Sequence, residues 1–215
     1  MKKISLLSLL FFVFNMATAQ QEISTAYATQ ATNMFAPLDK NRIPHKVLLD
    51  YGFEYTNLKA YNGTLSDSTV VDVPTLKHIY NTIFSSRVTS ATTGFINPNN
   101  FDSNWKNRTA GTITVSGLYY KYNAFINDAI NLGKVNFVNN QFQDKFVSGV
   151  WQNPYQEFQA FAMAPAISKY EGLSFTVKIP STIFYSNYQS LVQSIQIDFG
   201  NGAGYVTVPF NQNVT

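Results

Sequence analysis

The clearest hydrophobic pattern in this chain lies at Ser194–Phe210, where apolar and polar residues alternate on both sides of a glycine-rich segment. That segment, Gly200–Gly204, consists of residues that readily adopt the backbone angles of tight turns. Strict alternation places the apolar side chains of each arm on one face. The pattern therefore predicts a β-hairpin with one buried face, formed by Ile195, Ile197, Phe199, Val206, Val208 and Phe210.

Strand-like patterns also occur in three other segments. Thr112–Phe125 and Lys134–Phe146 are rich in aromatic and β-branched residues, and we expect them to pair as a second hairpin. Gly117 inside the first of these strands indicates a bulge or the close approach of another backbone. Leu173–Ile179 alternates throughout and ends at Pro180. The packed positions expected in the second hairpin are Val115, Tyr119, Tyr122, Val135 and Phe137.

The strongest helical pattern follows Asp72. The Asp72 carboxylate can accept backbone N–H bonds at a helix start, and Pro74 lies in the first turn, where its missing donor costs nothing. Arg87 follows at the negative end of the helix dipole. Helical spacing predicts one buried face, made of Leu76, Ile79, Tyr80, Ile83 and Phe84.

Two weaker patterns predict further helices. Apolar residues recur at helical spacing over Ile23–Phe35, and Pro37 would stop that helix. Pro44–Leu49 is predicted to form a short helix whose end is capped by Gly52. Thr89–Ala110 is dominated by Thr, Ser, Asn and Gly and predicts a loop.

The first nineteen residues have the layout of an export signal. Lys2 and Lys3 form a charged start, Ile4–Met16 is apolar, and Ala17–Ala19 provides the small residues of a cleavage site. The apolar run is shorter than the roughly 20 residues that a membrane span needs. Because the chain has no cysteine, it offers no cysteine for a lipid tether. We expect a mature chain that begins at Gln20 and is secreted or exposed at the cell surface.

Composition narrows the classes of function. Charged residues make up 13% of the chain, against roughly 25% in an average soluble domain. Removing Lys2 and Lys3 from the 15 basic residues leaves 13, against 12 acidic residues, so the mature net charge is about +1. This balance lacks the basic footprint of a nucleic-acid-binding protein. The aromatic content of 15% favours recognition by stacking and hydrogen bonding instead.

Catalytic and metal-binding chemistry lacks its usual residues. The chain has no cysteine and no G-x-S-x-G segment, and its two histidines, His45 and His78, are too few for a zinc site. We interpret both as surface or half-buried structural residues. Paired carboxylates that cleave glycosidic bonds are an alternative that the sequence leaves open. Turn and cap positions account for most of the candidate residues, which are Asp67, Asp72, Asp102, Asp128, Asp144 and Asp198. We therefore predict no catalytic residue, no metal site and no cofactor.

The aromatic residues of the predicted loop have two interpretations. In the first, Phe101 and Trp105 are ordinary members of a loosely ordered connection. In the second, their ring faces form a platform for sugars, because aromatic faces suit sugar CH groups. Phe101 and Trp105 are therefore candidate glycan-stacking residues.

The end of the chain resembles a known module. Phe199–Gly202, read as FGNG, is similar to the FGDG part of the motif of polycystic-kidney-disease (PKD) repeats, with Asn201 in place of the usual Asp. This resemblance implies an immunoglobulin-like β-sandwich in which Asp198, Gly200, Asn201 and Gly202 form a structural turn. A complete module has further strands after this motif, so we expect these 215 residues to be the N-terminal fragment of a longer protein.

A longer stretch, Leu38–Ser68, resembles the N-terminal regions of large exported proteins of Bacteroidetes and flavobacteria, which have no known activity. Within it, Asp67-Ser68-Thr69 looks like the acceptor motif of Bacteroidetes protein O-glycosylation. The resemblance implies that Ser68 carries a sugar.

These patterns predict an α+β protein with a signal peptide at 1–19, a helical and β-hairpin region at 20–150 and a partial immunoglobulin-like β-sandwich at 151–215. The leading hypothesis is a non-catalytic structural or binding region of a secreted or cell-surface bacterial protein, serving adhesion, spacing or glycan contact. Its expected partner is a polysaccharide or a cell-surface protein, without nucleic acid and without an integral membrane segment once the signal is removed. The alternative is an accessory region of an exported hydrolase whose catalytic domain lies beyond residue 215.

Overall fold

The computed structural model describes residues 29–30, 32–49, 59–66, 69–88, 93–106, 111–167 and 171–215. The predicted signal peptide, the helix cap at Gly52 and the predicted sugar acceptor Ser68 lie outside these residues. The chain divides into two compact units, Met1–Asp39 with Asp128–Pro154, and Lys40–Asn127 with Tyr155–Thr215. The second unit thus combines residues from both sides of the boundary predicted near residue 150.

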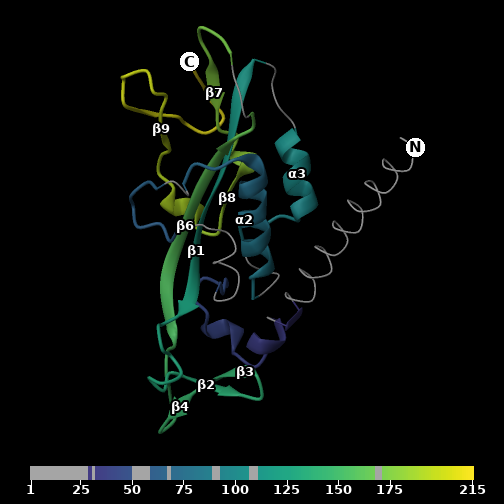
Figure 1. The fold of residues 1–215 in the computed structure, drawn as a ribbon, viewed down its shortest axis with the longest axis vertical. Coiled ribbons are helices and arrows are strands. Elements are labelled where there is room, and N and C mark those ends of the chain that lie inside the picture. The colour runs from purple at the N-terminus through teal and green to yellow at the C-terminus, as the bar shows by residue number, and fades with distance from the viewer. Residues whose placement is uncertain are drawn as a thin grey trace, which may run out of the picture. The chain divides into compact units, whose positions relative to one another are not determined.

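Strand β1, Thr112–Phe125, is the central strand of the second unit (Figure 1). The sequence prediction of this strand is confirmed, including both bounds. Its antiparallel neighbour is β6, Tyr155–Pro165, in an unbroken register. The predicted pairing with Lys134–Phe146 is therefore wrong, because a distant 11-residue strand provides a longer ladder than the nearby segment.

The opposite edge of β1 pairs with two short strands. β7, Thr176–Lys178, lies beside the start of β1, and β8, Phe184–Ser186, lies beside its middle. Both pairs are parallel. β11, Asn213–Val214, adds to β7 in antiparallel orientation, so the sheet has the order β11-β7-β1-β6 with β8 also on β1.

Beyond β8, the edge of β1 is completed by one side chain and one irregular segment. The Asn187 side chain accepts a hydrogen bond from the Lys121 N–H at 3.0 Å and donates one to the Lys121 carbonyl at 2.8 Å. The backbone of Val47–Leu49 then exchanges hydrogen bonds with Asn123 on both its N–H and its C=O. The Asn187 side chain therefore satisfies the backbone N–H and C=O of Lys121, as the neighbouring strands do for other residues of β1.

The predicted short helix at Pro44–Leu49 is wrong. Lys46 has a positive φ of 57°, which a helix does not allow, and Val47 and Leu48 form β-bridges. Val47, Leu48 and Leu49 are at most 1% exposed. A helix could not bury three consecutive side chains on one face, whereas an extended segment between two buried layers can. A 3₁₀ turn, η1 at Lys40–Arg42, precedes it.

Helix α2, Val73–Ser85, confirms the strongest helical prediction. The Asp72 side chain accepts a hydrogen bond from the Thr75 N–H at 2.8 Å, which satisfies one of the free donors at the helix start. Arg87 donates from Nε to the Phe84 carbonyl at the other end. The buried residues of this helix are Leu76, Ile79, Tyr80 and Ile83.

Helix α3, Pro98–Lys106, replaces part of the predicted loop Thr89–Ala110. The Asn97 side chain accepts a hydrogen bond from the Asn99 N–H at 2.9 Å, and Pro98 occupies the first helical position. The asparagines of this segment contributed to the loop prediction, but Asn97 followed by Pro98 begins a helix. The loop prediction is therefore wrong for this segment.

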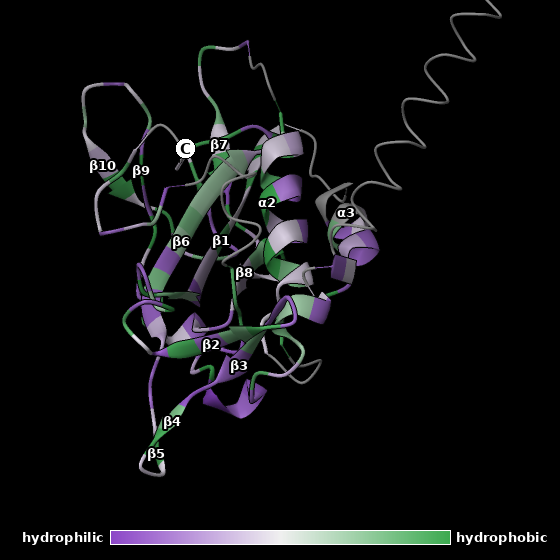
Figure 2. Cartoon of the chain, turned by 60° about the horizontal axis from the view of Figure 1, so that its bottom comes forward, coloured by the Kyte–Doolittle hydropathy of each residue, from purple (hydrophilic) through white to green (hydrophobic). Residues whose placement is uncertain are grey.

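Both faces of the main sheet are covered. On one face α2 packs against β6, where Ala160, Ala162 and Ala164 have side chains short enough to let the helix approach (Figures 1 and 2). The second face is covered by the C-terminal segment, whose Ile195 and Val208 join the core. The residues of this second core are Val115, Met163, Val177, Ile179, Phe184, Ile195 and Val208.

The C-terminal hairpin is present as predicted. β9, Gln196–Asp198, and β10, Tyr205–Thr207, pair in antiparallel orientation across the glycine-rich turn. The predicted strand at Leu173–Ile179 is confirmed only in its second half, β7. Leu173 itself lies outside the strand and is fully exposed.

The described part of the first unit contains two small hairpins. β2, Val135–Val138, turns into β3, Gln141–Asp144, and β4, Phe146–Val147, turns into β5, Val150–Trp151. The turn residues Asn139 and Asn140 have positive φ angles of 53° and 59°, typical of a tight hairpin turn. The single strand predicted over Lys134–Phe146 is therefore wrong, since these two asparagines fold it back on itself.

The fold class is α+β, as predicted, but an immunoglobulin-like sandwich is not confirmed. Immunoglobulin sheets are antiparallel, whereas β7 and β8 both run parallel to β1. In the part of the chain that is described, no helix has the length and apolar character to cross a membrane.

Gly117 lies where another backbone approaches β1, and it provides a test of this packing. A Cβ atom at Gly117 would lie 3.0 Å from Met163 Cγ and 3.1 Å from both the Ala162 carbonyl oxygen and Phe184 Cδ2. Gly117→Val should lower the free energy of unfolding in urea by about 1–3 kcal/mol through overpacking. The control is Gln156→Val, which places the same branched side chain at an exposed position of β6, where it causes no overpacking. Equal stability of the two variants would contradict this packing.

Candidate functional site

The predicted turn residues lie between β9 and β10. The Asp198 carboxylate accepts a hydrogen bond from the Gly200 N–H at 2.8 Å, and the Asn201 side chain accepts one from the Ala203 N–H at 3.0 Å. Gly200 and Gly202 have positive φ angles of 69° and 83°. Each of the two side chains therefore has an oxygen committed to the shape of the turn.

Phe101, predicted to stack on glycans, is a core residue. Its side chain is 2% exposed, and its ring stacks on Tyr80 with the centroids 4.5 Å apart. Because α3 forms where a loop was predicted, Phe101 faces inward and its ring is not available to a sugar. Trp105 lies on the same helix, and its side chain is outside the described part of the structure.

A charged cluster that sequence reasoning missed lies beside the end of β1. The Glu157 carboxylate accepts a hydrogen bond from Lys121 Nζ at 2.6 Å and lies 2.6 Å from His45 Nε2. The Tyr188 ring contacts the His45 ring at a centroid distance of 5.0 Å. His45 is half-buried as a residue, which agrees with one of the two predicted settings, and its side chain is 8% exposed. His45 and Glu157 are 112 positions apart, so no local pattern could have paired them.

The opposite charges of Lys121 and Glu157 form an ion pair. The hydrogen bond from Lys121, supported by His45, lowers the pKa of the Glu157 carboxyl. In return, the hydrogen bond to Glu157 raises the pKa of the Lys121 ammonium group. His78, the other histidine, lies separately on α2. Among the described residues, no group of three or more His, Cys, Asp or Glu side chains is placed to hold a metal ion.

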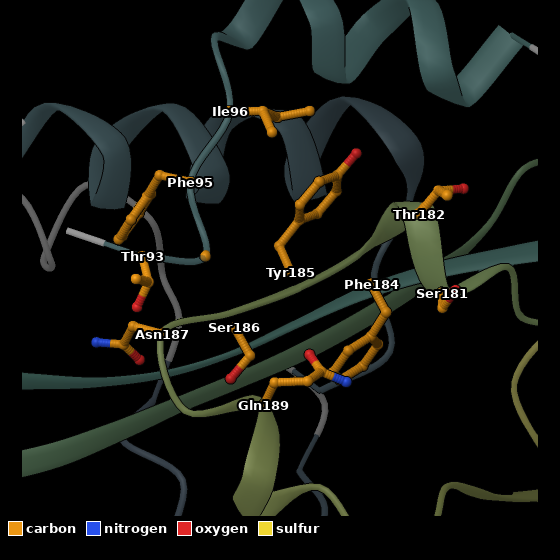
Figure 3. A pocket seen from close by; sticks show the side chains of 11 residues that line it. Thr93, Phe95, Ile96, Ser181, Thr182, Phe184, Tyr185, Ser186, Asn187 and Gln189 are labelled. Carbon is orange, nitrogen blue, oxygen red and sulfur yellow. The ribbon is translucent and has the colours of Figure 1, made fainter. Parts of the chain in front are cut away.

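An open cleft of about 400 Å³ lies beside β8 in the same unit (Figure 3). One wall is the loop 93–96 before α3, and the other is the 3₁₀ turn η3, Ser181–Ile183. Phe184–Asn187 and Gln189, at the start of the 3₁₀ turn η4, complete the lining. All of these lining residues are uncharged.

Two buried tyrosines hold the loop wall of the cleft. The Tyr80 hydroxyl donates to the Ile96 carbonyl at 2.7 Å and accepts from the Ile96 N–H at 2.8 Å, and the Tyr120 hydroxyl donates to the Gly94 carbonyl at 2.7 Å. Burial raises the pKa of Tyr80 and raises that of Tyr120 well above its ordinary value. Both hydroxyls therefore stay protonated and keep donating over the whole physiological pH range.

The loop and β8 touch through their backbones at Gly94. A Cβ atom at this position would lie 1.8 Å from the Ser186 carbonyl oxygen, so no side chain fits. Gly94 also has a positive φ of 82°, which glycine adopts without cost. The width of the cleft at this end is therefore fixed by a glycine.

Several polar groups of the lining are committed to the protein itself. Asn187 bonds to Lys121, Ser181 bonds to Asn211, and Ser186 Oγ accepts from the Tyr188 N–H. The Tyr185 hydroxyl differs from these groups, because it is buried without a hydrogen-bond partner among the described residues, and its burial raises its pKa to about 12.

Three other lining side chains are exposed and make no hydrogen bond to any residue that the structure describes: Thr93, Thr182 and Gln189. The cleft thus offers two hydroxyls and one amide to a ligand.

Comparisons of the chain with protein-family models, with curated proteins and with solved structures give no match. The functional argument therefore rests on the geometry of the cleft and of the charged cluster beside it.

Gly94→Ala should displace the loop wall and destabilise the second unit. We expect its free energy of unfolding to fall by about 1–3 kcal/mol more than that of Gly63→Ala, through the clash with the Ser186 carbonyl. Gly63 is a matched control because its φ is also positive, at 94°, but nothing lies within 4 Å of a Cβ atom there. The difference between the variants in urea unfolding isolates the clash. A difference near zero would show that the two segments do not meet.

Glu157→Gln should change the pH dependence of stability. Folding lowers the pKa of Glu157, so its ionised carboxylate stabilises the folded state. This stabilisation is fully present above the ordinary pKa of 4.5, and it is lost as the pH falls through the pKa of the folded state. At neutral pH the variant should be less stable by about 0.2–1 kcal/mol, as for other exposed ion pairs. Under acid conditions below the folded pKa, the gap should close.

A double-mutant cycle with Lys121→Met, measured by urea unfolding at both pH values, assigns the effect to this pair. A gap that is independent of pH would contradict the assignment.

Proposed function

We propose that this chain is a non-catalytic structural or binding region of an exported bacterial protein, and that the cleft beside β8 is its binding site. The observation that carries the proposal is the lining of the cleft, which combines uncharged hydrogen-bonding groups with aromatic rings and contains no charged side chain. Such a lining recognises polar, uncharged ligands by shape and hydrogen bonding.

The chemistry around the cleft supports binding rather than catalysis. General acid–base catalysis needs an ionisable group placed against the substrate, with a pKa near the working pH. The lining of the cleft contains no Asp, Glu, His, Lys or Arg, and burial raises the pKa of its tyrosine, Tyr185, to about 12. Nearby, Lys121 and His45 each bond to the Glu157 carboxylate. Their pairing stabilises the structure beside the cleft and leaves the cleft itself neutral.

Export and surface location rest on the signal-like pattern of residues 1–19 and on the resemblance of Leu38–Ser68 to exported proteins. The proposed partner is a surface polysaccharide or a cell-surface protein. The immunoglobulin-like relationship of the C-terminal hairpin stays a prediction carried by Phe199–Gly202. Within this proposal, glycan contact moves from the buried Phe101 to the cleft, and stacking by Trp105 stays a prediction.

The purified chain should bind to surface material of bacteria and release it chemically unchanged. Binding is measured as retention of the chain on immobilised polysaccharide and membrane-protein fractions. Chromatography of the material that is eluted with the chain then shows whether it is chemically unchanged. Gly94→Ala should reduce retention because it displaces one wall of the cleft, whereas Gly63→Ala should not. Conversion of the bound material into a product, lost on substitution within the chain, would contradict a non-catalytic role.

A further inference from the structure

We infer that the cleft beside β8 binds a neutral saccharide and that Thr93, Thr182 and Gln189 supply its hydrogen bonds. This inference rests on the proposed binding function and adds the class of ligand and the residues that recognise it. The three side chains come from three different segments: the loop 93–96, η3 and η4. Figure 3 shows Thr93 and Thr182 on opposite sides of Tyr185, with Gln189 nearer to Ser186.

The absence of charge in the cleft selects against ionic ligands. A phosphate, carboxylate or ammonium group would lose its hydration on entering and would gain no opposite charge from the lining residues. Lys121 and Glu157 of the charged cluster bond to each other at 2.6 Å. The Arg87 guanidinium lies over the Phe84 ring, 3.5 Å from its centroid and 5.5 Å from that of Phe95. A nucleotide or a phosphopeptide is therefore a poor match for this site.

The three exposed side chains match the chemistry of sugar hydroxyls. A threonine hydroxyl and a glutamine amide can each donate and accept hydrogen bonds, as can every hydroxyl of a sugar. Thr93, Thr182 and Gln189 make no hydrogen bond within the described part of the chain, so a ligand need not displace a bond of the protein. Other polar residues of the lining, such as Asn187, are already satisfied.

Apolar groups in the lining complement the CH groups of a sugar ring. Phe95 and Ile96 are half-buried in the loop wall and present partly exposed apolar surface to the cleft. These apolar side chains would pack against the CH groups of the sugar ring, while the three polar side chains form hydrogen bonds with its hydroxyls. The volume of about 400 Å³ lies within the range of roughly 300–1,000 Å³ that is usual for small-molecule sites.

The site is organised before a ligand arrives. Tyr80 and Tyr120 fix the loop wall from the core, and Gly94 packs directly against Ser186. On the other side, Asn187 is bonded to the edge of β1. Since these backbone segments are already held, binding costs mainly the ordering of the three exposed side chains.

The test titrates the purified full-length chain with neutral oligosaccharides of glucose, mannose and galactose, using calorimetry and ligand-observed NMR. The triple variant Thr93→Ala/Thr182→Ala/Gln189→Ala should lose at least about tenfold in affinity, and each single variant about 2–10-fold, as expected for neutral hydrogen bonds. The matched control Gln156→Ala/Thr64→Ala removes an exposed amide and an exposed hydroxyl that do not line the cleft, and it should bind like the wild type. Because the substituted residues are exposed, the urea midpoint should be unchanged.

The outcomes separate this inference from the proposed function. Saccharide binding that is insensitive to salt and is lost in the triple variant supports the inference. No saccharide binding, or equal binding by the triple variant, overturns it, while retention on a surface protein would leave the proposed binding function standing. Binding of an uncharged peptide through the same three residues would overturn the ligand class alone. Salt-dependent binding of a charged ligand would overturn the argument from charge.

Discussion

The structure of the second unit depends on the hydrogen bonding of β1. A strand of 14 residues in the middle of a sheet presents N–H and C=O groups on both edges, and burial makes each unpaired group costly. β6 satisfies one edge in an unbroken register. The other edge is assembled from β7, β8, the Asn187 side chain and the backbone of Val47–Leu49. Segments that are distant in the sequence must therefore converge on this one strand.

The cleft is a consequence of that convergence. Pairing with β1 brings Phe184–Ser186 beside the helical layer, and the bond between Asn187 and Lys121 holds the chain that follows. From the same core, Tyr80 and Tyr120 extend their hydroxyls to the loop before α3. Residues that stabilise the core thus also position the walls of the site, so the exposed side chains between those walls are held at defined places.

The few charged residues of this chain include a cluster beside the cleft, whereas the lining of the cleft is uncharged. Lys121 and Glu157 pair their opposite charges beside β1, His45 bonds to the same carboxylate, and the lining of the adjacent cleft contains no charged side chain. The low charge content of the sequence predicted recognition by hydrogen bonding and stacking. The structure differs in where such recognition is possible, because Phe101 is enclosed in the core whereas Thr93 and Gln189 are exposed in the cleft.

The sequence by itself determined the elements whose signals are local. The helical spacing after Asp72 predicted α2, and strict alternation predicted the hairpin of β9 and β10, because the period of apolar residues reflects which face is buried. The aromatic and β-branched residues of Thr112–Phe125 predicted β1. Two further local signals could have been read: Asn97-Pro98 as a helix start and Asn139-Asn140 as a hairpin turn.

Only the tertiary structure decided which segments pair and which polar side chains meet. Distant parts of the chain meet in three places. β6 pairs with β1, and His45 contacts Glu157. One cleft is lined by Thr93, Thr182 and Gln189. Backbone hydrogen-bonding groups are the same in every residue except proline, so periodicity shows that a strand has a buried face without showing which segment will cover it or lie beside it.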